Sequence, residues 1–186
     1  MTQDIKGVYS AAATPIEADG SPCFELLTAH CHGLLAEGCH GIALLGTTGE
    51  ANNFSVDERM ALLDAACDSG ISGDQLLPGT SCSNLSETKA LTAHALSCQV
   101  KACVILPPFY YKGVSDEGLF RFYAQLVEEL KDSRLKIILY HIPQMTQVPI
   151  SHDLIARLRA DFPGIFVGIK DSAGDIENMK KMVKRF

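Results

Sequence analysis

Residues 165–171 read Ile-Phe-Val-Gly-Ile-Lys-Asp, a short apolar run that ends in two charged side chains. A run of this length predicts a buried strand rather than a helix. Alternation along the strand places Phe166, Gly168 and Lys170 on one face. A segment with helical spacing begins near Asp175, so the stretch forms one strand-helix unit.

The same unit recurs along the chain. Apolar runs predict strands at residues 7–14, 41–45, 75–80, 101–106, 136–141 and 165–170. Helical spacing of apolar residues predicts helices at 24–37, 55–69, 87–97, 116–131 and 152–159, with a sixth from 175. Ser55 with Glu58 forms a capping box, and Ser115 is a candidate N-cap. Strands alternating with helices predict an α/β fold with a parallel sheet.

Two architectures fit this order of elements: an open doubly wound sheet and a closed (β/α)8 TIM barrel. No Gly-x-Gly-x-x-Gly follows the first strand, which weakens the dinucleotide-binding form of the open sheet. Polar and Gly-rich residues follow several different strands, as in a barrel site assembled from many strand ends. About six of the eight units are present, so we expect a single partial barrel domain over residues 1–186, either part of a longer chain or completed by another segment.

The composition excludes several function classes. The chain has 186 residues, a formal net charge of −6 and no clustered basic run, which argues against nucleic acid or an anionic membrane as a partner. The apolar stretches fall short of the roughly 20 residues that span a bilayer. Residues 1–9 lack the pattern of a secretory signal, so we expect a cytoplasmic protein.

The cysteines do not suggest disulfides or metal binding. Seven cysteines at irregular intervals predict reduced, partly buried side chains. The neighbours Cys31-His32 and Cys39-His40 look like metal ligands, but no second close-spaced set accompanies them. We therefore expect no metal ion.

Lys170 is the strongest candidate for chemistry. Near the end of an apolar strand, loss of water would disfavour an ammonium and leave an amine able to attack a carbonyl. Position alone also allows a solvent-exposed lysine beside Asp171. Tyr140 lies at the matching place on the preceding strand, and its hydroxyl could relay protons or simply cap the core.

Two loops are candidate binding segments. Gly46, Thr47 and Thr48 follow the second strand in a Gly-bounded turn whose hydroxyls and N–H groups could hold a carboxylate, or could form only a turn. Tyr110 lies in the aromatic run at 107–112, where exposed rings favour a substrate or a partner surface.

Together these motifs resemble the dihydrodipicolinate synthase and N-acetylneuraminate lyase family of pyruvate-dependent class I aldolases. The resemblance covers essentially the whole chain. Its motifs are Gly46-Thr47-Thr48-Gly49-Glu50, Gly79-Thr80, Pro108-Phe109-Tyr110-Tyr111, Tyr140-His141-Ile142-Pro143 and Gly168-Ile169-Lys170-Asp171-Ser172-Ala173-Gly174-Asp175.

The resemblance implies a (β/α)8 barrel that often assembles as a homotetramer, with no cofactor beyond the covalent imine on Lys170. It implies that Tyr140 relays protons and that Thr47 and Thr48, in the Gly46 loop, hold the carboxylate of a small 2-keto acid. Tyr110 would lie in the loop that in some members reaches a neighbouring site.

Two departures narrow the expected activity. Met145 stands where true dihydrodipicolinate synthases usually carry Arg, and a thioether cannot replace a bidentate guanidinium. We therefore expect a Schiff-base lyase acting on pyruvate or a 2-keto sugar acid, and not a true dihydrodipicolinate synthase. The alternatives are a keto-deoxy sugar acid dehydratase and a catalytically silent chain that associates with another. The second departure is length, since family members continue through two more units.

Overall fold

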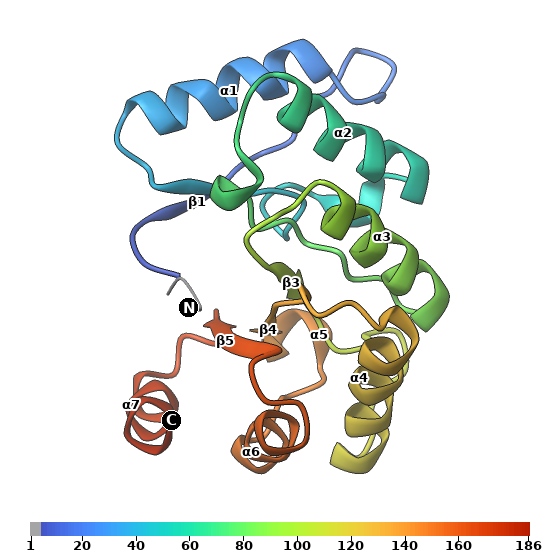
Figure 1. Ribbon diagram of the computed structural model, residues 1–186, viewed down its shortest axis with the longest axis vertical. Coiled ribbons are helices and arrows are strands. Elements are labelled where there is room, and N and C mark those ends of the chain that lie inside the picture. Colours follow the sequence, from blue (N-terminus) through green and yellow to red (C-terminus); the bar gives the residue numbers. More distant parts are fainter. Residues whose placement is uncertain (1–4) are drawn as a thin grey trace. The chain divides into compact units, whose positions relative to one another are not determined.

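The computed structural model describes residues 5–186 (Figure 1). Part of the segment used to predict the absence of a signal, residues 1–4, lies outside this range. The described residues form two compact units, unit 1 with residues 5–80 and 89–103 and unit 2 with residues 81–88 and 104–186. Within this range no helix is both long and apolar enough to cross a membrane.

Unit 1 holds a short parallel sheet and its helices (Figure 1). Strand β1 (Tyr9–Ala11) pairs in parallel with β2 (Gly41–Ala43), and α1 (Phe24–Ala36) connects them. The 3₁₀ turn η1 (Ala51–Asn53), α2 (Val56–Asp68) and the 3₁₀ turn η2 (Gly73–Gln75) follow. Helix α3 (Leu85–Ser97) begins in unit 2 and continues in unit 1.

The strand predicted at residues 75–80 is not a regular strand. It makes one isolated parallel bridge, between Ile42 and Leu76. Leu77 N then donates to Ile42 O at 2.9 Å, and Gly79 N donates to Leu44 O at 2.7 Å. Pro78, between these two residues, directs its nitrogen away from β2 and has no N–H to donate to a strand on its other side.

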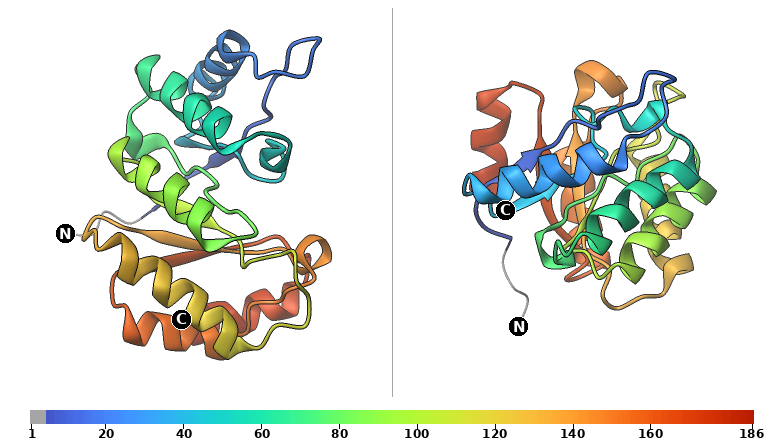
Figure 2. Two further views of the ribbon diagram at one scale, coloured as in Figure 1. Left: turned by 90° about the vertical axis from the view of Figure 1, so that its right-hand side faces the viewer. Right: turned by 90° about the horizontal axis from the view of Figure 1, so that it is seen from above.

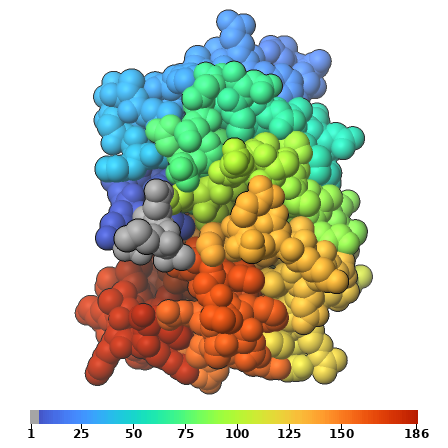
Figure 3. Space-filling model, in the orientation of Figure 1, coloured from blue at the N-terminus to red at the C-terminus, as the bar shows by residue number. Residues whose placement is uncertain are grey.

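Apart from Cys103, unit 2 holds a three-stranded sheet ordered β3-β4-β5 (Cys103–Ile105, Ile137–His141 and Phe166–Asp171). Helices α4 (Asp116–Leu130), α6 (His152–Asp161) and α7 (Ile176–Arg185) cover one face of it (Figure 2). Helix α7 contributes the red surface in Figure 3. The short helix α5 (Pro143–Thr146) was not predicted; Pro143 occupies its first turn, where a missing N–H costs nothing.

The helix start signals in the sequence are confirmed. Ser55 and Glu58 form a reciprocal capping box at the start of α2. The Ser115 hydroxyl accepts from Gly118 N at the start of α4, and the Asp175 carboxylate accepts from two amides in the first turn of α7. These side chains supply partners for amides that have none within the helix.

A β-bulge changes which residues share a face in β5. Ile137 pairs with Phe166, but the next residue, Ile138, pairs with Gly168. The extra residue reverses the alternation, so Phe166 faces the helices, where its ring centroid lies 6.0 Å from that of Tyr123 in α4. The prediction that Phe166 and Gly168 share a face was therefore wrong.

Candidate active site

Lys170 and Tyr140 lie side by side in unit 2. They are paired residues of the parallel strands β5 and β4. The Lys170 Nζ atom lies over the face of the Tyr140 ring, 3.8 Å from its centroid. The main chain of the two strands fixes this contact, because paired residues of neighbouring strands project on the same side of the sheet.

Tyr140 and Lys170 differ in burial. The Tyr140 side chain is buried, with 4% of the residue exposed, whereas Lys170 is only half-buried. Beside them, a Cβ atom on Gly168 would meet only Ile138 Cγ1, at an ordinary 3.8 Å. The ring is thus held in the core while the amine stays within reach of a small molecule from solvent.

Asp171 fixes the loop that follows Lys170. One carboxylate oxygen accepts from Ala173 N at 2.8 Å, and the other accepts from the Asn178 side chain of α7 at 3.3 Å. Ser172 N donates to His141 O at 2.8 Å, which extends the β4–β5 ladder past the lysine. The loop is therefore attached to both β4 and α7, and Lys170 stands on a well-supported strand end.

His141, whose role the sequence left open, supports the fold. Its Nδ1 atom accepts from Ile150 N at 3.2 Å, and 7% of the residue is exposed. Burial lowers the pKa of His141 below the usual value; nearby His152 lowers it further, whereas Asp171 raises it. The ring is neutral with Nδ1 as acceptor, an arrangement that holds the segment leading into α6.

A hollow of about 540 Å³ lies in unit 2 next to this supporting network. It is lined by His141, Pro143, Pro149, Ile150, Ser151, His152, Ala173, Asp175 and Asn178. The hollow is large enough for a small molecule. Its lining includes neither Lys170 nor Tyr140 and consists of residues in the segments that hold the end of β5 in place.

Tyr110 lies in an exposed loop of the same unit. Tyr110 is 71% exposed and packs edge-on against Tyr111, with ring centroids 5.1 Å apart. Lys112 anchors the loop, because its ammonium donates to Thr146 O at 2.9 Å and to Phe109 O. The structure thus presents the tyrosines on an anchored loop.

The Gly46-Thr47-Thr48 turn belongs to unit 1, whereas Lys170 belongs to unit 2. Both threonines are exposed, and Thr14 Oγ1 donates to Gly49 O at 2.7 Å beneath them. The turn begins at Leu45, whose φ of 56° is unusual for a side chain of that size. A non-glycine residue held in this region marks a turn determined by its surroundings.

Arg59 is a supporting residue that the sequence did not reveal. It lies on α2 with 3% of the residue exposed, and its Nη2 atom donates to Gly79 O at 3.0 Å. Gly79 in turn approaches the threonine turn, since a Cβ atom there would lie 2.2 Å from Leu45 O. A buried charge on the apolar face of a helix was the signal that could have identified it.

In the adjacent pairs Cys31-His32 and Cys39-His40, the side chains have different partners and do not form a common site. Cys31 is fully buried, and burial raises the pKa of its thiol to about 11. The His32 ring instead bonds to Ser69 at the surface. His40 Nδ1 accepts from Val8 N, so this ring is engaged by the main chain before β1.

Comparison with solved structures defines the class of fold. The crystal structure of dihydrodipicolinate synthase from Agrobacterium tumefaciens str. C58 matches with a TM-score of 0.92 at 33% identity, over 96% of this chain and 62% of that one. YagE from E. coli K12, of the dihydrodipicolinic acid synthase family and solved with pyruvate, matches with a TM-score of 0.85 at 27% identity, over 95% and 58%. The predicted α/β barrel fold is confirmed over this shared part.

The family follows from the sequence match. The Dihydrodipicolinate synthetase family matches residues 4–186, and the chain belongs to that family. An uncharacterized DapA-like lyase from Chloroflexus aurantiacus is 36% identical over 183 residues, which are 97% of this chain and 60% of the relative. The chain thus spans about 60% of the length of the curated relatives it matches.

Proposed function

We propose that this chain carries the reacting lysine of a Schiff-base-forming lyase of the class I aldolase type. The observation that carries the proposal is the contact between Lys170 Nζ and the Tyr140 ring, 3.8 Å from the centroid, at the paired ends of two parallel strands. An amine beside a phenol at the carboxyl ends of parallel strands suits attack on a ketone.

In the proposed reaction the Lys170 amine adds to the keto carbon of the substrate. The carbinolamine loses water, and a protonated imine remains on the lysine nitrogen. The hydroxyl group on the departing fragment loses its proton, the carbon–carbon bond breaks, and an aldehyde leaves while the bond's electron pair passes to the imine and gives an enamine. The enamine takes up a proton on carbon, and water hydrolyses the resulting imine to release the 2-keto acid and the free Lys170 amine. We assign the delivery and removal of these protons to the Tyr140 hydroxyl, and the proposed reaction uses no metal or organic cofactor.

The proposed substrate is pyruvate or a small 2-keto sugar acid. Family membership supports this class, as does the pyruvate in the solved structure of YagE. We assign the substrate carboxylate to Gly46, Thr47 and Thr48, and the outer part of the substrate to the Tyr110 loop. Met145 is 63% exposed and offers no guanidinium, which favours a lyase over a true dihydrodipicolinate synthase.

The test is borohydride trapping. The protein is incubated with pyruvate, reduced and digested, and the peptide that contains Lys170 is examined by mass spectrometry. We expect an adduct on Lys170 that is lost in Lys170→Ala and retained in Lys180→Ala, a control on the exposed side of α7. A folded protein without the adduct, or with equal labelling of many lysines, would contradict the proposal and leave the silent, associating chain as the alternative.

Product analysis separates the two enzymatic possibilities. An aldolase releases free pyruvate and an aldehyde from a keto sugar acid, whereas a dehydratase gives a keto acid with an unchanged carbon count. We propose a homotetramer, as the resemblance implies, in the cytoplasm, as the signal-free pattern of residues 1–9 suggests. Sedimentation of the purified protein tests the subunit number.

A further inference from the structure

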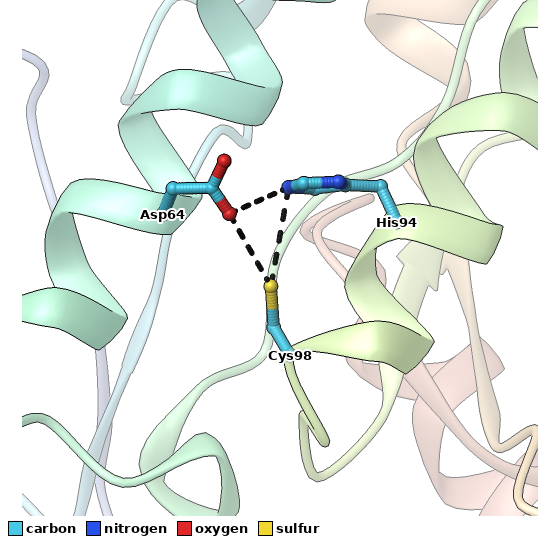
Figure 4. A group of neighbouring side chains, drawn as sticks. All are labelled: Asp64, His94 and Cys98. Carbon is cyan, nitrogen blue, oxygen red and sulfur yellow. Dashed lines mark hydrogen bonds and ion pairs between the residues drawn. The ribbon is translucent and has the colours of Figure 1, made fainter.

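Three side chains with metal-binding atoms converge between α2 and α3 in unit 1 (Figure 4). Asp64 Oδ1 lies 2.8 Å from His94 Nε2, and Cys98 Sγ lies 3.6 Å from the same oxygen and 3.9 Å from the same nitrogen. All three are half-buried, so the cluster is open to ions from solvent.

A fourth side chain, Cys67, lies near Cys98 but outside the group of three whose ligand atoms all lie within 4.8 Å of one another. Burial raises the pKa of both the Cys67 and Cys98 thiols, and each thiol also affects the pKa of the other. Asp64 and Cys67 are three residues apart on α2, while His94 and Cys98 are four apart at the end of α3, so each pair lies on one helical face. The prediction that no metal ion binds was based only on cysteines and histidines that are adjacent in the sequence. It did not take into account residues spaced three or four apart on two separate helices.

We propose that Asp64, Cys67, His94 and Cys98 form a zinc site. Bonds to zinc of about 2.0 Å from oxygen or nitrogen and about 2.3 Å from sulfur place tetrahedral ligand atoms about 3.3 Å apart for N and O, and about 3.5–3.6 Å apart for S with either. The three distances in Figure 4 each lie within about half an ångström of these values. Small side-chain rotations suffice for these three residues, and Cys67 must turn toward them to complete the site.

An ordinary Asp–His ion pair explains less of the arrangement. It accounts for the contact between Asp64 and His94, but it gives no reason for two thiols to gather on the same side. Two thiolates, one imidazole and one carboxylate are the ligand types that zinc prefers. On binding, each thiol loses its proton to solvent, and the metal takes its place between the sulfur atoms and the other ligands.

Four protein ligands leave no open position, so the proposed zinc is structural. It would link the C-terminal part of α2 to the C-terminal end of α3. Metal binding to the folded form alone stabilises that form, so unit 1 should unfold at a higher temperature when zinc is present.

The test uses the reduced full chain, stripped of metal with a chelator and titrated with Co²⁺ and then Zn²⁺. We expect one Co²⁺ per chain, with visible bands of tetrahedral cobalt and a thiolate charge-transfer band that Zn²⁺ abolishes. Cys98→Ser and His94→Gln should each weaken binding by at least about 100-fold, since even outer-sphere changes cost 10–100-fold.

Matched controls are Cys39→Ser and His30→Gln, a thiol and an imidazole elsewhere in unit 1, which should leave the titration unchanged. Circular dichroism shows that each variant is folded. Three results would overturn the proposal. The first is a folded parent chain that shows no thiolate–cobalt band, and the second is an unchanged metal affinity in Cys98→Ser. The third is a Cys67–Cys98 disulfide that forms in air, together with a reduced protein that binds no metal. The borohydride trapping experiment at Lys170 can succeed or fail independently of these three results, so the two proposals are tested separately.

Discussion

Tyr140 shows how a single residue combines structural and proposed chemical roles. Its ring is buried in unit 2, while the amine of Lys170 rests on its face. A phenylalanine would keep the packing and lose only the hydroxyl. In a variant that stays folded, an effect of that change on imine formation reports on the hydroxyl group.

We expect Tyr140→Phe to slow borohydride-trapped imine formation by about 100-fold or more, because a positioned acid or base contributes about 10²–10⁴-fold. The rate is measured by mass spectrometry of quenched samples. Tyr111→Phe, on an exposed ring, is the control. Equal rates in Tyr140→Phe and the parent would remove Tyr140 from the relay.

His141 makes stability depend on pH. Its pKa is lowered by burial in the folded state, so below about pH 6.5 the unfolded chain binds a proton that the native ring does not. The contribution of neutral His141 to the free energy of unfolding is complete above the pKa of the histidine in the unfolded chain. It is lost as the pH falls through the lower pKa of the histidine in the folded chain. We expect His141→Asn to reduce the fall in urea midpoint between neutral and mildly acidic pH, with His30→Gln as control. An unchanged pH profile in His141→Asn would contradict this assignment.

At the scale of elements, close approaches of the main chain shape the threonine turn. A Cβ atom on Gly79 would overlap Leu45 O, whereas a Cβ atom on Gly33, within α1, would meet nothing within 4 Å. The two glycines therefore offer a matched pair of substitutions.

We expect Gly79→Ala to destabilise unit 1 by about 1–3 kcal/mol, since the added methyl must displace the segment that supports the turn. Gly33→Ala should stabilise the protein by about 0.5–1 kcal/mol through helix propensity. Both changes are measured by urea unfolding. If Gly79→Ala were as stable as the parent, the close approach would not constrain the turn.

At the scale of the whole molecule, the exposed apolar residues of α7 are the surface through which we expect the chain to associate with other molecules. Ile176, Met179 and Val183 recur at helical spacing on α7, and 58%, 39% and 79% of these residues are exposed. An apolar stripe of this kind favours association, because contact removes it from water.

We expect the chain to self-associate as its concentration rises, and Ile176→Lys with Val183→Lys to reduce this association. Light scattering against concentration measures it. Leu26→Lys, an exposed apolar position on α1, is the control. Scattering that falls equally with the control would contradict a role for α7.

The sequence by itself determined most of the order of strands and helices, except the segment at 75–80 and helix α5, because apolar periodicity and caps such as Ser55 and Asp175 are local signals. It also pointed to Lys170 and Tyr140, since equivalent positions on neighbouring parallel strands follow from alternation. Only the tertiary structure decided the bulge that turns Phe166 toward the helices and the convergence of Asp64, His94 and Cys98. Strand register and helix–helix contact depend on packing between segments distant in the chain, which no local pattern encodes.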